Sequence, residues 1–75
     1  MDINYEKQVG RNIRNLRIQN KLTQEQLTAK MQVSGCDITR SALAKIEVGQ
    51  RHIYPDEIKL IKTILKVSYE EIFDD

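Results

Sequence analysis

Small polar and basic side chains occupy one side of a short segment between residues 39 and 47. Leu43 and Ile46 are three positions apart, so in a helix they share one apolar face. The side chains that then point elsewhere are Thr39, Arg40, Ser41, Ala44 and Lys45. An α-helix fits the major groove of B-DNA, where Arg and Lys donate to guanine O6 and N7 and short side chains contact thymine methyls or phosphates. This face therefore has the chemistry to read base pairs, although a solvated helix surface with incidental charges explains the same pattern.

Other reactive side chains are too few for catalysis or metal binding. Cys36 is the only cysteine and His52 the only histidine, so a disulfide, a zinc site and a Cys–His pair all lack a partner. No Ser-His-Asp spacing is present either. We expect no enzymatic activity, no cofactor and no metal. We interpret Cys36 as an inert small residue, with a redox or metal role as the alternative.

Charge is unevenly divided along the chain. The net charge is only +1, yet residues 1–53 hold nine Lys or Arg against five Asp or Glu, a balance of +4. Residues 54–75 hold three Lys against six acids, a balance of −3. A molecule polarised in this way can turn its first two thirds toward a polyanion such as double-stranded DNA, but ordinary uneven surface charge is an equally good explanation.

The remaining composition indicates a cytoplasmic protein. One free thiol fits a reducing compartment. No apolar run approaches the roughly 18 residues that span a bilayer, so we expect no membrane partner. The N-terminal residues are polar and of mixed charge, unlike a signal peptide.

Apolar residues recur at helical spacing along the whole chain, which predicts an all-α fold. A first helix over about residues 4–19 carries the stripe Tyr5, Val9, Ile13 and Leu16. Gly10 lies within that helix, where glycine costs about 1 kcal/mol relative to alanine, so we expect close packing there.

Capping residues mark where the later helices begin. The N-caps are Thr23, Thr39 and Ser68, of which the first and last form capping boxes with Gln26 and Glu71. Pro55 opens a further helix and Gly49 stops the one before it. Residues 32–37 break the pattern and indicate a turn, with an extension of the second helix through Val33 as the alternative. Five short helices around one core are predicted.

In this order the elements resemble the lambda-repressor-like, Cro/C1-type (Xre family) DNA-binding domains. The segments that carry the resemblance are Val9-Gly10-Arg11-Asn12-Ile13, Leu16-Arg17, Leu22-Thr23-Gln24-Glu25-Gln26-Leu27, Ile46-Glu47-Val48-Gly49, Leu65-Lys66-Val67-Ser68 and Ile72-Phe73. They cover about residues 9–73 of what we interpret as a single domain of residues 1–75. The resemblance implies a compact five-helix domain with a helix-turn-helix, acting as a sequence-specific transcriptional regulator of the repressor type.

The resemblance also implies roles for individual residues. Its base-contact positions fall on Thr39, Arg40, Ser41, Ala44 and Lys45. Phosphate contacts are expected from Gln24, Arg11, Arg14, Gln50, Arg51 and His52, of which Gln24 also braces the recognition helix. Arg17 and Glu47 fall where the family has a partly buried ion pair, which we interpret as structural because a bidentate contact fixes orientation. For Gln24, Arg11 and Arg14, plain solvent exposure is the alternative.

The sequence departs from the family pattern in three places. The turn between the two central helices usually spans about three or four residues, and this chain has about five residues more than the common family spacing, between Met31 and Ile38. This longer turn can re-aim the recognition helix. Val48 replaces a polar residue, which removes one phosphate contact. Ile53 stands where proline is common, and Tyr54 is a weak cap for the fourth helix.

The sequence leaves two further kinds of binding partner undecided, a second copy of the chain and a different protein. A symmetric homodimer through the C-terminal helix, with Tyr69, Ile72 and Phe73 in contact, would set two recognition helices about 34 Å apart. Core closure is the alternative explanation for these apolar residues. The second hypothesis for function is a protein–protein module of the same fold, such as an antitoxin or the partner of another regulator, which the low net charge and the acidic C-terminal third favour.

Overall fold

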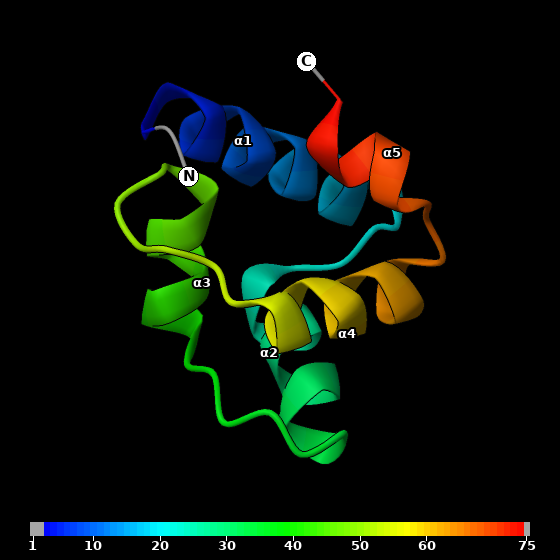
Figure 1. Cartoon of the computed structure of the whole chain (residues 1–75). Coiled ribbons are helices and arrows are strands. Elements are labelled where there is room, and N and C mark those ends of the chain that lie inside the picture. The colour runs from blue at the N-terminus through cyan, green and yellow to red at the C-terminus, as the bar shows by residue number, and fades with distance from the viewer. Residues whose placement is uncertain (1–2, 75) are drawn as a thin grey trace.

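The computed structural model describes residues 3–74, which fold into helices without any strand in that range. In chain order they are α1 (Ile3–Gln19), α2 (Gln24–Val33), α3 (Arg40–Glu47), α4 (Pro55–Leu65) and α5 (Tyr69–Phe73) (Figure 1). The described part measures 30 × 21 × 19 Å along its principal axes. The prediction of a compact all-α fold with five helices is confirmed.

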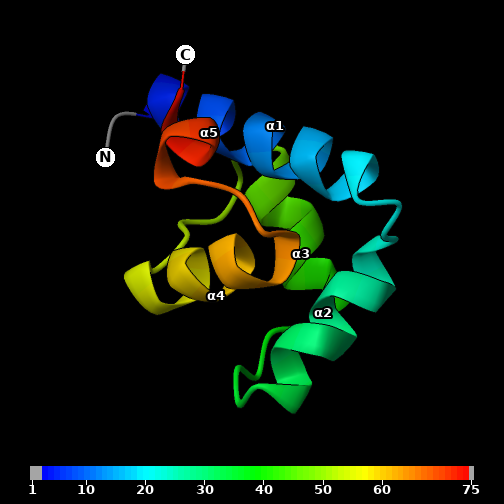
Figure 2. The same cartoon turned by 90° about the vertical axis from the view of Figure 1, so that its right-hand side faces the viewer.

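One apolar core joins all five helices. Its fully buried side chains are Val9, Ile13, Leu27, Met31, Leu43, Ile46, Ile61, Leu65 and Ile72. α1 packs on α3 and α5, while α2 packs on α3 and α4 (Figure 2). α3 therefore has α1 on one flank and α2 on the other, and its remaining side faces out.

Capping hydrogen bonds set the beginnings of α2, α3 and α5, at the residues the sequence predicts. At α5, Ser68 Oγ accepts from the Glu71 N–H at 3.1 Å. Thr23 Oγ1 accepts from the Gln26 N–H at 3.0 Å, and Gln26 Oε1 accepts from the Thr23 N–H at 2.9 Å. Thr39 Oγ1 accepts from the Ala42 N–H at 3.1 Å, which fixes the first turn of α3. Each bond satisfies a backbone donor that a helix N-terminus otherwise leaves unpaired.

The start of α4 is capped by a residue other than its N-cap. Tyr54 makes no side-chain cap, in agreement with the weak cap expected there. The carboxylate of Glu57 instead accepts a hydrogen bond from the Tyr54 N–H at 2.9 Å. Pro55 takes the first helical position, where its missing N–H is harmless.

The longer segment between α2 and α3 leaves α3 seated in the core. α2 continues through Val33, so the turn begins at Ser34 and not at Gln32. Ile38 is buried, and its carbonyl accepts a hydrogen bond from Gln32 Nε2 at 2.7 Å. These contacts anchor the chain just before Thr39, and the extra residues extend away at the far end of α2.

α1 and α3 approach at backbone distance. A Cβ on Gly10 would overlap the carbonyl oxygen of Ile46, so only glycine fits at this crossing. The close packing expected around Gly10 is thereby located at the end of α3. None of the helices within residues 3–74 is long and apolar enough to cross a lipid bilayer.

Candidate nucleic-acid interface

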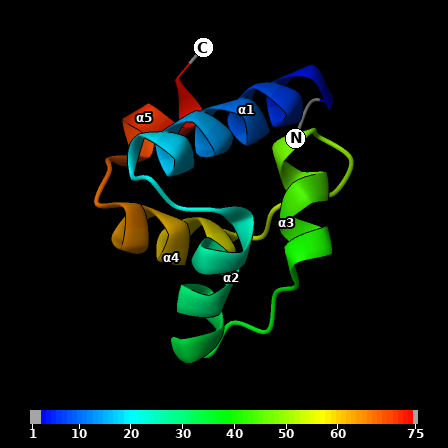
Figure 3. The same ribbon diagram turned by 180° about the vertical axis from the view of Figure 1, so that it is seen from behind.

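The outer face of α3 carries the side chains that the sequence assigns to base contacts. Thr39, Arg40, Ser41 and Lys45 are exposed, and Ala44 is half-buried between them. Leu43 and Ile46 point the opposite way and are buried. Seen from the front and from behind, α3 stands at one edge of the molecule, on the side away from α5 (Figures 1 and 3). The extra residues of the preceding turn leave this face open to solvent.

The polar groups on this face are available to an external ligand. Among residues 3–74, no hydrogen bond or ion pair engages the side chains of Arg40, Ser41 or Lys45. Their guanidinium, hydroxyl and ammonium donors are the groups that pair with base edges in a major groove.

A buried ion pair holds the end of α3. Arg17 Nε and Nη2 donate to the two carboxylate oxygens of Glu47 at 2.7 and 3.0 Å. The two side chains are 9% and 1% exposed. Arg17 Nη1 also donates to the carbonyl of Leu22 at 2.8 Å, which ties the α1–α2 connection to the same guanidinium. Arg17 and Glu47 are thus in the bidentate contact that the family resemblance implies.

Gln24 extends this network to α2. Gln24 Nε2 donates to Glu47 Oε1 at 3.0 Å, so the carboxylate of Glu47 bonds to residues of both neighbouring helices. Gln24 is the first residue of α2 and is half-buried. Its position braces the end of α3 while one amide hydrogen and the amide oxygen remain for another partner. No buried side-chain N or O atom in the described chain lacks a hydrogen-bond partner.

A basic cleft flanks the end of α3. Lys7, Arg11 and Arg14 line it from α1, and Val48 lines it from the C-terminus of α3, around a volume of about 450 Å³. Arg11 and Arg14 were assigned to phosphate contacts from the sequence, but Lys7 was not. The sequence does contain a signal for Lys7, because residues 7, 11 and 14 have the four-and-three spacing of side chains that share one helix face.

The position of Lys7 depends on a glycine in the left-handed region. Gly49 has a φ of 77°, and a Cβ there would overlap the side chain of Lys7. The aliphatic part of Lys7 therefore packs directly on the Gly49 backbone, next to the end of α3. This contact joins α1 to the loop that follows α3.

Three polar side chains of the loop after α3 differ in their contacts: Arg51 and His52 contact carboxylates, and Gln50 does not. Gln50 is exposed, and no hydrogen bond of its side chain occurs in the described range. Arg51 donates from both terminal nitrogens to Glu57 at 3.0 and 3.1 Å, and its guanidinium lies 5.4 Å from the Tyr54 ring centre. Those hydrogen bonds to Glu57 raise the pKa of Arg51. His52 Nδ1 contacts the Glu6 carboxylate, although the ring is largely exposed.

The sequence alone does not predict the pairing of Arg51 with Glu57. The pairing depends on the path of the loop between the two residues as well as on their separation of six positions. It ties the loop to α4 and occupies the Nη1–Nη2 edge of the guanidinium, one of the edges that can bind a phosphate in a bidentate contact. Cys36, half-buried in the turn before α3, lies apart from this surface. Burial, with the nearby carboxylates of Glu57 and Asp56, raises the pKa of its thiol.

Comparison with known families gives one finding over most of the chain. A family model described as helix-turn-helix matches residues 13–72. This range lies inside the span of about 9–73 over which the sequence motifs were recognised. No curated protein and no solved structure gives a significant match to this sequence.

Proposed function

This chain belongs to the Cro/C1-type, Xre-like helix-turn-helix family, and from that premise we propose that it is a repressor-type regulator that occupies specific operator DNA. α3 enters the major groove with its exposed face toward the base pairs. Arg40 and Lys45 donate to guanine, while Ser41 and Ala44 admit close approach and can contact a thymine methyl. Thr39, at the N-terminus of α3, contacts a phosphate or a thymine methyl.

One observation supports the proposal above all: the exposed face of α3 has hydrogen-bond donors without partners among the described residues, and the end of this helix is held in place. Arg40 and Lys45 have no partner among the described residues, whereas Glu47 at the end of the same helix is held by Arg17 and Gln24. A face oriented before binding loses less conformational entropy when it meets DNA.

Phosphate contacts on both flanks of α3 complete the proposed interface. On one flank, the cleft of Lys7, Arg11 and Arg14 gathers three cations beside the end of α3. On the other, Gln24 offers its free amide groups at the N-terminus of α2, where backbone N–H groups and the helix dipole also favour an anion. Gln50 adds a contact from the loop. Contacts of this kind fix the register of the protein on the duplex and carry no sequence information.

Arg51 and His52 have a weaker part in this interface than the sequence alone suggests. Arg51 holds the loop to α4 through Glu57, so any phosphate contact it makes uses its remaining N–H groups. The Nδ1 atom of His52 contacts the Glu6 carboxylate, so one ring nitrogen already has a partner. Both residues shape the loop that presents Gln50.

Selection of duplex DNA from a random pool is the experiment that tests the proposal. The full chain should enrich one short motif, and Lys45→Ala should relax the preference at one position of that motif. Lys59→Ala is the matched control, because Lys59 is exposed on α4 beside Cys36, apart from the proposed contacts. Failure to bind any duplex at low salt would overturn the proposal and favour the protein–protein module.

A further inference from the structure

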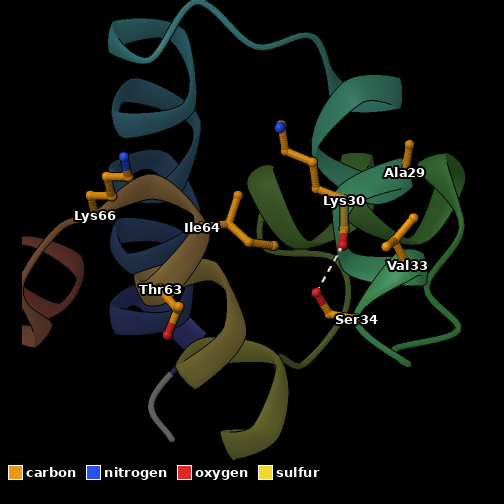
Figure 4. Close-up of a pocket in the computed structure, with 7 residues that line it drawn as sticks. All are labelled: Ala29, Lys30, Val33, Ser34, Thr63, Ile64 and Lys66. Atoms are coloured by element: carbon orange, nitrogen blue, oxygen red, sulfur yellow. Dashed lines mark hydrogen bonds between the residues drawn. The ribbon is translucent and has the colours of Figure 1, made fainter.

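A groove runs between the C-terminal half of α2 and α4. It consists of two adjoining hollows of about 560 and 290 Å³, and Ser34 and Thr63 line both of them. Figure 4 shows the larger hollow, where Ile64 of α4 points toward α2. None of the residues proposed to contact DNA lines either hollow. α2 and α4 lie in front of α3 in Figure 2, so the groove and the proposed recognition helix are on different sides of the molecule.

Apolar side chains line both walls of this groove. Ala29 and Val33 are four positions apart on α2, so they share one helix face. Leu60 and Ile64 have the same spacing on α4. Val33 is 90% exposed, more than any other large hydrophobic side chain in the described range, and such an exposed apolar surface indicates a binding partner. Two apolar rows, one on each wall, suit a third helix with an apolar face of its own.

The longer connection between α2 and α3 builds one end of the groove. Residues 33–36 line it, and they lie between Met31 and Ile38, where this sequence is longer than the common family spacing. These residues are not needed to place α3, because hydrogen bonds at Ile38 and Thr39 hold its entry. The groove therefore depends on the part of the chain that departs from the family pattern.

The rim of the groove is basic. Lys30 on α2 and Lys66 at the end of α4 border the larger hollow, which no acidic side chain lines (Figure 4). Lys59 and Asp56 border the smaller one. None of the three lysines forms an ion pair within residues 3–74. An occupant with carboxylates beside its apolar residues would therefore meet unpaired ammonium groups.

The acidic helix of the chain itself, α5, is too short to fill this groove. It has five residues, which span about 7.5 Å, whereas the groove follows α4 from Asp56 to Lys66, about 15 Å along the helix. Ile72 of α5 is also buried in the core, and its carbonyl accepts a hydrogen bond from Asn12 Nδ2 at 3.0 Å. The occupant is therefore a longer helix from another protein.

We propose that this groove binds an acidic amphipathic helix of a different protein. The apolar face of that helix packs over Val33 and Ile64, and its flanking carboxylates pair with Lys30 and Lys66. The inference goes beyond the proposed function and does not depend on it, since α3 takes no part in the contact. Because the groove and α3 lie apart, one chain can bind this partner and DNA at the same time.

Selection of displayed peptides against the full chain, without DNA, tests the proposal. The peptides have about 16 residues, a length at which isolated helices begin to form, with apolar residues on one face and Glu, Gln or Lys at random on the other. Acidic peptides should be enriched. The double variant K30E/K66E should weaken their binding, measured by fluorescence anisotropy, by more than about tenfold, because like charges then face each other. The same peptides with serine at every apolar position should not bind.

The double variant R14E/K45E is the matched control for net charge. Arg14 and Lys45 are exposed on α1 and α3 and do not line the groove. Since salt screens distant charges, this control should bind the peptides within about threefold of the unaltered chain. Val33→Glu is a second groove variant, whose exposed position spares the core, and it should weaken binding as K30E/K66E does. Circular dichroism melts establish that every variant folds.

Three results would overturn the proposal. The first is a selection that enriches no peptide, or only basic or uncharged ones. The second is peptide binding that folded K30E/K66E and Val33→Glu leave unchanged, which would place the contact elsewhere on the chain. The third is self-association of the unaltered chain in sedimentation equilibrium that K30E/K66E abolishes, which would show that a second copy occupies the groove.

Discussion

The guanidinium of Arg17 on α1 and the carboxylate of Glu47 at the end of α3 face each other through two parallel hydrogen bonds of 2.7 and 3.0 Å. Both side chains are almost completely buried, and Gln24 adds a third hydrogen bond to the same carboxylate. Three helices therefore meet at one charged group. The orientation of the proposed recognition helix depends on this group.

Arg17→Ala should destabilise the fold strongly. The change leaves the Glu47 carboxylate buried with only the Gln24 amide as a donor, and breaking a buried pair on one side costs about 3–5 kcal/mol. Thermal and denaturant unfolding followed by circular dichroism measure the loss. Arg14→Ala on the exposed side of the same helix is the control and should change stability by less than about 0.5 kcal/mol. An unchanged melt for Arg17→Ala would remove the structural role assigned to the pair.

Arg40→Ala and Lys45→Ala should alter which operator is preferred. If each side chain donates to a base, its loss weakens binding to the selected operator by about 1–3 kcal/mol and relaxes one position. The fold should be unaffected, because neither side chain has a partner in the described structure. Equilibrium titrations against the operator and its single-base variants test this. Equal weakening on every sequence would show that these residues hold phosphates instead.

Lys7→Ala should weaken binding to all duplexes alike. Lys7 shares a cleft with Arg11 and Arg14, and each phosphate contact contributes about 0.9 to the negative slope of log K against log salt. Removing one contact lowers the slope by that amount. Affinities measured at several salt concentrations give the slope, with Lys59→Ala on α4 as the control. A Lys7→Ala slope equal to that of the unaltered chain places the lysine outside the interface.

Gly10→Ala should destabilise the protein, although alanine is the better helix former by about 1 kcal/mol. The new methyl would overlap the Ile46 carbonyl, and overpacking of this kind costs about 1–3 kcal/mol. The result should appear as a lower midpoint of unfolding. Asn15→Ala, on the exposed side of α1, is the control and should hold or raise the midpoint. A more stable Gly10→Ala would mean that α1 and α3 lie farther apart.

The thiol of Cys36 should ionise at higher pH in the folded chain than in the unfolded one. Burial, aided by the carboxylates of Glu57 and Asp56, raises its pKa. The folded state then keeps the proton longer, so this thiol favours folding below its unfolded pKa and that contribution is lost as pH rises through the folded pKa. Alkylation rates against pH, with and without denaturant, measure both values. Cys36→Ala should lack this component of the pH-dependent stability.

Local signals made most of the helical framework predictable. The capping residues Thr23, Thr39 and Ser68 act on backbone groups within three residues, so their effect can be recognised without knowing the fold. Pro55 marked the start of α4 for the same reason. The end of α2 was less certain, because Gln32 and Val33 are exposed and carry no apolar periodicity.

Contacts between residues that meet only in the folded chain are the ones that the sequence does not predict. The family resemblance supplied the positions of Arg17 and Glu47, which lie thirty residues apart. The resemblance gave no signal for the ion pair of Arg51 with Glu57, or for the packing of Lys7 on Gly49. The first depends on how the loop folds back to α4. The second depends on the left-handed backbone of Gly49 and on the crossing of α1 and α3.

The open surroundings of Gly35 make the α2–α3 connection a place where chain length can change. No atom would lie within 4 Å of a Cβ at this glycine, while Ile38 and Thr39 fix the entry to α3 independently. Doubling the length of a flexible loop costs only about 0.6 kcal/mol. Because the hydrogen bonds at Ile38 and Thr39 hold the entry to α3, we expect insertions here to leave α3 in place. We therefore expect that a fluorescent label inserted at this point leaves the placement of α3 and the stability of the fold unchanged.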